Sequence, residues 1–74
     1  MVHISILSFE NELVLNCKKM TNGEEFQLII DTNTLELIQK PDYPDMDAST
    51  AYSHVYNLLE KGLPLPSETV AVWG

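Results

Sequence analysis

Apolar and polar residues alternate along the first half of the chain in short segments. Asn11, Asn22 and Asn33 interrupt this alternation, and each falls eleven residues after the last. Strict alternation is typical of strands that are buried on one face, and turn residues at regular intervals are typical of hairpins. The pattern therefore predicts a four-stranded antiparallel β-meander over residues 2–39.

The turns also predict how the strands pair. Two-residue turns at residues 10–11, 22–23 and 32–33 are the favoured hairpin connections for such sequences. They predict the following apolar cross-strand pairs: Ile4 with Cys17, Ile6 with Leu15, Cys17 with Leu28, Leu15 with Ile30, Ile30 with Leu35, and Leu28 with Leu37. A four-residue loop at the third turn would preserve the same face, because a shift by two residues leaves the side-chain alternation unchanged.

All three hairpins place their apolar residues on one common face of the sheet. This predicted core face consists of Val2, Ile4, Ile6, Leu13, Leu15, Cys17, Phe26, Leu28, Ile30, Leu35 and Leu37. A face of this kind needs a second layer to bury it.

The second layer is predicted over residues 47–61, where the apolar spacing changes to that of a helix. Asp47 is the expected N-cap, and Gly62 is the expected left-handed residue that ends the helix. One stripe of the helix is apolar and comprises Ala48, Ala51, Tyr52, Val55, Tyr56, Leu58 and Leu59. We expect this stripe to cover the core face of the sheet.

The expected fold is thus α+β: an antiparallel four-stranded meander with one helix packed on one face. A single domain is expected over residues 1–74, with an acidic loop at 40–47 and an extended tail at 63–74. The tail contains the β-prone sequence TVAVW, which predicts an optional short fifth strand.

Charge narrows the classes of partner. The chain has a net charge of −7, from eleven acidic residues and four lysines, and it contains no arginine. Phosphate backbones and anionic membrane surfaces are normally bound by clusters of Lys and Arg, so direct binding to nucleic acid or membrane is not expected. No segment resembles a signal peptide or a membrane span, and the expected location is the cytoplasm.

Neither the cysteine nor the histidines predict a catalytic site. Cys17 belongs to the apolar series and is expected to be buried rather than reactive. His3 and His54 have no orienting partner in the predicted arrangement, so ordinary surface histidines are favoured over general bases or metal ligands.

The densest group of acids lies in the loop before the helix, at Asp42, Asp45 and Asp47. Calcium prefers such oxygen ligands, but the spacing lacks the glycine and the distal glutamate of an EF-hand loop. A solvated acidic loop is the favoured interpretation. No phosphate-binding or nucleophile motif is present, so neither an enzyme nor a cofactor is expected.

The remaining candidate feature is the back face of the sheet, opposite the core face. Its apolar residues include Leu7, Val14, Ile29 and Ile38, and the predicted register places Ile29 between Asn16 and Glu36. Trp73 is expected to dock on the sheet, at its back face or at an edge. Leu7, Val14, Ile29, Ile38 and Trp73 therefore form the candidate interaction surface.

The favoured hypothesis is a small acidic domain that binds another protein and is not an enzyme. One alternative is a mimic of nucleic acid that blocks a DNA- or RNA-binding protein, which the charge permits. A second alternative is a structural homodimer formed through the back face or an edge strand.

Overall fold

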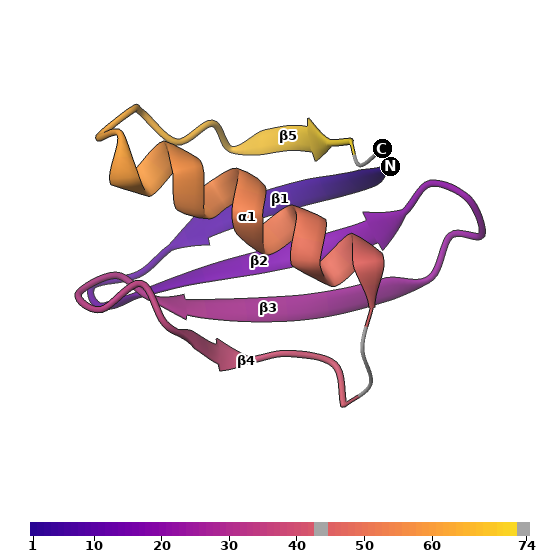
Figure 1. Ribbon diagram of the computed structural model, residues 1–74, viewed down its shortest axis with the longest axis horizontal. Helices are drawn as coiled ribbons and strands as arrows, with labels where there is room; N and C mark the ends of the chain where they lie inside the picture. The colour runs from indigo at the N-terminus through magenta and orange to yellow at the C-terminus, as the bar shows by residue number, and fades with distance from the viewer. Residues whose placement is uncertain (43–44, 73–74) are drawn as a thin grey trace.

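One antiparallel sheet and one helix make up the regular structure of the computed structural model (Figure 1). The structure describes residues 1–42 and 45–72. The elements are β1 (Val2–Ser8), β2 (Glu12–Lys19), β3 (Glu25–Asp31), β4 (Leu37–Gln39), α1 (Met46–Glu60) and β5 (Glu68–Ala71).

The strands lie in the order β4-β3-β2-β1-β5, and α1 crosses one face of the sheet (Figure 1). The α+β prediction is confirmed, including the optional fifth strand. That strand pairs with the free edge of β1, where Val2 lies opposite Ala71 and His3 opposite Val70. β5 therefore extends the sheet at its edge and does not lie across the back face.

The first hairpin has the predicted register, and the second does not. Ile4 lies opposite Cys17 as expected. Across β2 and β3, however, Cys17 lies opposite Phe26, where the sequence predicted Leu28. The predicted pairing is wrong by two residues. The predicted faces are nevertheless correct, because side chains alternate with a period of two and a shift by two residues leaves each side chain on the same face of the sheet.

Loop length explains this shift. The second hairpin closes with a four-residue loop, in which the Lys19 amide donates to the Glu24 carbonyl over 2.8 Å and the Gly23 amide donates to the Lys19 carbonyl over 2.9 Å. Gly23 has a φ of 77°, the left-handed conformation that glycine adopts at little cost. Asn22-Gly23 is thus the second half of a longer loop and not a complete two-residue turn.

The third hairpin repeats this loop with a leucine in place of the glycine. The amides of Asp31 and Leu35 make the equivalent hydrogen bonds, of 2.9 and 2.7 Å, and Leu35 has a φ of 64°. The predicted pair of Ile30 with Leu35 is therefore wrong: Ile30 lies opposite Leu37, and Leu35 belongs to the loop. The Tyr52 hydroxyl donates to the Leu35 carbonyl over 2.6 Å and so ties this loop to the helix.

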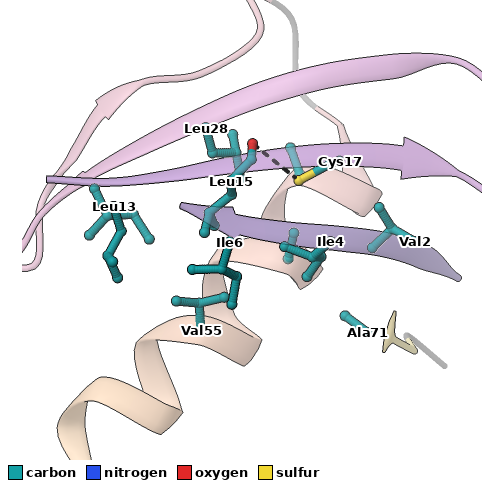
Figure 2. Close-up of a cluster of buried hydrophobic side chains, with 12 residues drawn as sticks. Val2, Ile4, Ile6, Leu13, Leu15, Cys17, Leu28, Val55 and Ala71 are labelled. Atoms are coloured by element: carbon teal, nitrogen blue, oxygen red, sulfur yellow. Dashed lines mark hydrogen bonds between the residues drawn. The ribbon is translucent and has the colours of Figure 1, made fainter. Parts of the chain in front are cut away.

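The core lies between the helix and the sheet (Figure 2). Its buried members are Val2, Ile4, Ile6, Leu13, Leu15, Cys17, Leu28, Ile30, Ala48, Ala51, Val55 and Ala71. Phe26, Leu37, Tyr52 and Leu59 are partly buried against this cluster. The predicted core face and helix stripe thus meet, except that Leu35, Tyr56 and Leu58 are not members of this cluster, and β5 adds Ala71.

Both ends of α1 are defined by side chains or backbone geometry. The N-cap is Asp45, whose carboxylate accepts from the backbone amides of Asp47 and Ala48, so the predicted cap at Asp47 is wrong. Asp47 instead lies in the first turn, where it is buried. At the other end Gly62 has a φ of 68°, and the amides of Gly62 and Leu63 return to the carbonyls of Leu59 and Leu58. Gly62 therefore ends the helix as predicted.

Within the part of the chain that the structure describes, no helix is long and apolar enough to cross a membrane.

The burial of Cys17 gives a direct test of this core. Its side chain points between the sheet and the helix, the residue is 2% exposed, and burial raises the pKa of its thiol to about 12 (Figure 2). Because thiol reagents attack the thiolate, we expect very slow labelling of the native protein at pH 8 and rapid labelling in denaturant. Stopped-flow absorbance with a chromogenic thiol reagent measures both rates. Rapid labelling of the native protein would contradict the core assignment.

Candidate interaction surface

The back face of the sheet carries an apolar row that crosses three strands. Side chains alternate between the two faces of a strand, so the neighbours of the core residues point away from α1. Leu7 of β1 lies opposite Val14 of β2, and Val14 lies opposite Ile29 of β3. These three residues, the apolar row, are therefore adjacent in space although they are distant in sequence.

No helix or strand among the described elements packs on this face, since all five strands share one sheet and the single helix lies on the other side (Figure 1). Leu7 is 49% exposed. Ile38, the unpaired residue of β4 where its register with β3 shifts, is 55% exposed. Val14 and Ile29 are half-buried by their neighbours. Trp73, the fifth residue of the predicted surface, lies outside the described residues.

A row of polar side chains runs beside the apolar row. The side-chain amide of Gln39 donates to Gln27 over 3.1 Å, and that of Gln27 donates to Asn16 over 3.0 Å. These residues, the amide row, connect β4, β3 and β2, and all three are exposed. A side-chain amide has two donor hydrogens and two acceptor lone pairs, so the row can make further hydrogen bonds to a bound molecule.

Charged residues border these two rows. On the far side of the amide row, Lys18 lies opposite both Glu25 and His3. His3 Nε2 lies 3.7 Å from Oε1 of Glu68, a residue that lies opposite Ser5. On the far side of the apolar row, Glu12 lies directly opposite Asp31. Across β2 and β3 the back face is therefore sorted into four successive pairs, which we call bands: a mixed-charge band (Lys18 and Glu25), an amide band (Asn16 and Gln27), an apolar band (Val14 and Ile29) and an acidic band (Glu12 and Asp31).

This sorting could not be seen in the predicted register. A two-residue turn at Asn22-Gly23 would place Val14 opposite Asp31 and Ile29 opposite Asn16, which mixes apolar and polar residues. The observed shift by two residues brings Val14 and Ile29 together. The residues of the surface were predictable, but their adjacency depended on the loop length.

The cysteine and the two histidines, which were the candidate reactive residues, make contacts within the fold. Cys17 is buried, and its thiol donates weakly to the Leu15 carbonyl over 3.7 Å. His54 was expected to be solvated, but its Nε2 lies 3.2 Å from Thr69 Oγ1 because β5 runs beside the helix. The partners of His3 and His54, Glu68 and Thr69, both come from β5, and the uncertain pairing of this strand left them unpredicted.

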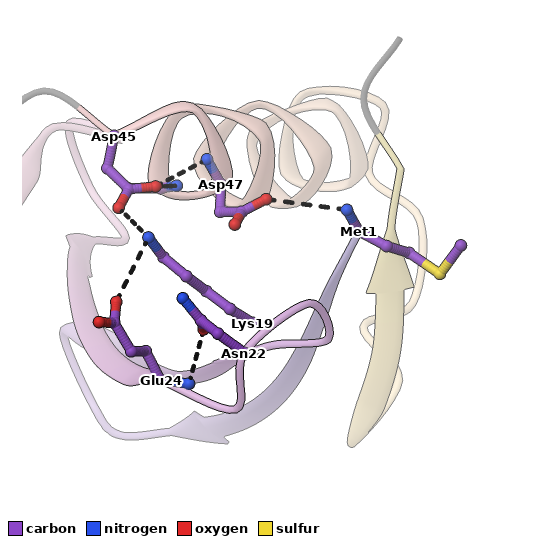
Figure 3. A network of polar contacts seen from close by, with 7 residues as sticks. Met1, Lys19, Asn22, Glu24, Asp45 and Asp47 are labelled. Atoms are coloured by element: carbon purple, nitrogen blue, oxygen red, sulfur yellow. Dashed lines mark hydrogen bonds and ion pairs between the residues drawn. The ribbon is translucent and has the colours of Figure 1, made fainter.

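The acidic loop before the helix is a structural junction (Figure 3). Lys19 Nζ lies 2.6 Å from Asp45 Oδ2 and 3.6 Å from Glu24 Oε2. The amino terminus of Met1 lies 3.8 Å from Asp47 Oδ1. These contacts join the end of β2 and the start of β1 to the first turn of α1. Among the described residues, no group of three or more His, Cys, Asp or Glu side chains is arranged to hold a metal ion.

Comparison with known proteins adds no function to this arrangement: no protein-family model matches the chain, and neither a curated protein nor a solved structure matches it significantly.

The junction predicts an acid-sensitive contribution to stability. The Lys19 ammonium holds the pKa of the Asp45 carboxyl below its ordinary value of 3.8, with help from the amides that it caps. A carboxyl with a lower pKa in the folded state binds protons more readily when unfolded, so its contribution is present above pH 3.8 and is lost as pH falls through the folded pKa. Asp45→Asn keeps a good N-cap but removes the charge, and it should cost about 1 to 3 kcal/mol at neutral pH.

Urea denaturation at pH 6, 4 and 3 measures this effect. The difference in unfolding free energy between the wild type and Asp45→Asn should shrink as the pH falls. Asp42→Asn is the matched control, since Asp42 is an exposed acid of the same loop. A constant difference at all three pH values would rule out the charged contact as its source.

Proposed function

We propose that this chain is a small, non-enzymatic domain that binds another protein through the back face of its sheet. The observation that supports the proposal best is the apolar row of Leu7, Val14 and Ile29, which spans three adjacent strands on a face that no described element covers. Exposed apolar patches bordered by polar residues are typical of protein interaction sites.

The side of the sheet that faces the helix differs from the back face, and this difference supports the same proposal. Its apolar residues are buried against α1, and the polar groups around it are engaged, as in the contact of Lys19 with Asp45. The stability of the fold thus has a physical source that does not involve the apolar row. The apolar row itself has no part in the core that α1 covers.

The back face also has the composition of a recognition surface. Apolar side chains supply the burial that drives association, and the hydrogen-bonding groups of Asn16, Gln27 and Gln39 lie beside them. We place this interaction in the cytoplasm, where the free thiol of Cys17 is compatible with a reducing environment.

A charged substitution in the middle of the apolar row tests the proposal. Val14→Asp places a carboxylate between Leu7 and Ile29, and a partner that covers the row would have to desolvate it. We expect the immobilised wild-type protein to retain a specific partner from a lysate of its source organism, and the variant to lose it. Retained proteins are identified by mass spectrometry.

Ser53→Asp is the control, because Ser53 is exposed on α1, the helix on the other side of the sheet. It adds the same charge without touching the back face and should retain the partner. Circular dichroism melts establish that both variants fold. Equal retention by the wild type and a folded Val14→Asp protein would show that the back face is not the binding surface.

A further inference from the structure

The acidic band of the back face contains two like charges without a counter-charge among the described residues. Glu12 and Asp31 lie directly opposite each other on neighbouring strands, and like charges in this position destabilise a sheet. No lysine, histidine or amino terminus of the described residues lies within ion-pair distance of either carboxylate.

Only one of these two acids has a local structural role. Asp31 Oδ1 accepts from the amides of Asn33 and Thr34 and so stabilises the loop after β3. The side chain of Glu12 makes no hydrogen bond or ion pair among the described residues, and Glu12 is exposed. By contrast, the mixed-charge band is compensated within the sheet, because Lys18 lies opposite Glu25.

The uncompensated acids border the apolar row directly. Glu12 is two residues before Val14 on β2, and Asp31 is two residues after Ile29 on β3. Residues at this spacing share a face and lie roughly 7 Å apart. Phe9 adds to the apolar surface at this end, since its amide donates to the Glu12 carbonyl and its side chain is 57% exposed.

A partner that covers the apolar row must therefore come close to two negative charges. Removing carboxylates from water without a counter-charge is costly, so the partner has to supply a cation there. Lysine and arginine suit this position, because their aliphatic stems can pack on apolar side chains while the charged ends reach the carboxylates.

A second copy of this chain does not supply that charge. Among the strand residues of its back face are four acids, Glu12, Glu25, Asp31 and Glu68, against Lys18 and His3. Two such faces would bring like charges together, and the whole chain has a net charge of −7. Charge complementarity favours a basic partner over a homodimer.

We infer that the partner is a protein whose docking segment places a lysine or arginine over Glu12 and Asp31 and aliphatic side chains over Leu7, Val14 and Ile29. This inference rests on the proposed function, since it names the chemistry of the partner that would occupy the same surface.

A display library of random 12-residue peptides, selected on the immobilised full chain, tests the inference. We expect enrichment of peptides in which Lys or Arg is flanked by aliphatic residues. Synthetic copies, followed by fluorescence anisotropy, should bind the Glu12→Gln/Asp31→Asn variant more weakly by a factor on the order of ten. Glu60→Gln is the matched control on the helix, and it should leave the affinity unchanged.

The remaining outcomes separate the inference from the proposed function. Peptides that bind the double variant as well as the wild type, but lose affinity for Val14→Asp, would overturn the inference and leave the proposed function standing. Val14→Thr, which keeps the branched shape favoured in strands, replaces Val14→Asp if that variant does not fold. Peptides that bind all variants equally, or no enrichment at all, would count against both.

Sedimentation velocity of the purified protein tests the competing hypothesis, in which a second copy of the chain covers the back face. The inference predicts a monomer at micromolar concentration. A dimer that Val14→Asp converts to a monomer would show that a second copy occupies the back face, and it would overturn the inference.

Discussion

The backbone pairing of β2 with both of its neighbours is the constraint on which the rest of the molecule depends. Residues of β2 are hydrogen-bonded to β1 on one side and to β3 on the other along most of the strand. Because side chains alternate strictly, this pairing sends Leu13, Leu15 and Cys17 to the helix and Val14 to the opposite face. A slip of one residue would expose the core series, so the core excludes it, and the loop length decides between registers that differ by two residues.

The helix is held against this sheet by contacts that are spread along its length. Asp45 and Lys19 join its first turn to the end of β2, and the Tyr52 hydroxyl contacts the loop before β4. Further along, His54 lies beside Thr69 of β5. Apolar burial on this side supplies the main stabilisation, and these polar contacts define how the helix is oriented.

The same register also decides which side chains are neighbours on the back face, although core packing does not depend on their order. There it sorts the residues of β2 and β3 into an apolar band with an amide band on one side and an acidic band on the other. The compensated charges of Lys18 and Glu25 contrast with the opposed carboxylates of Glu12 and Asp31. Asp31 also accepts hydrogen bonds from the loop after β3, whereas Glu12 makes no such contact among the described residues, and the basic partner that we propose would supply the missing counter-charge.

The hydrophobic pattern predicted the fold well because the face on which a strand residue lies depends on its odd or even position along the strand and not on its exact cross-strand partner. Cys17 faces the core whether it lies opposite Leu28, as predicted, or Phe26, as observed. The end of the helix was also predictable, since Gly62 has the conformation for which glycine is favoured. The N-cap is two residues earlier than predicted because two aspartates compete for the cap, and the contact with Lys19 that favours Asp45 is tertiary.

What could not be predicted depends on loop length and on distant contacts. Asn22-Gly23 is compatible with a short turn and with the end of a longer loop, and the sequence does not distinguish them. Leu35 carries no turn signal at all, although it adopts the left-handed conformation beside Tyr52. The apolar row was therefore predicted as a set of residues but not as a continuous row, because its continuity follows from the register of β2 and β3.

That register can be measured directly by NMR in a sample with labelled methyl groups. Side chains on directly opposite residues of antiparallel strands lie about 5 Å apart, within the range of the nuclear Overhauser effect. The account predicts strong cross-peaks between the methyl groups of Val14 and Ile29, and between those of Val14 and Leu7. Cross-peaks from Ile29 to the side chain of Asn16, with none to Val14, would contradict it.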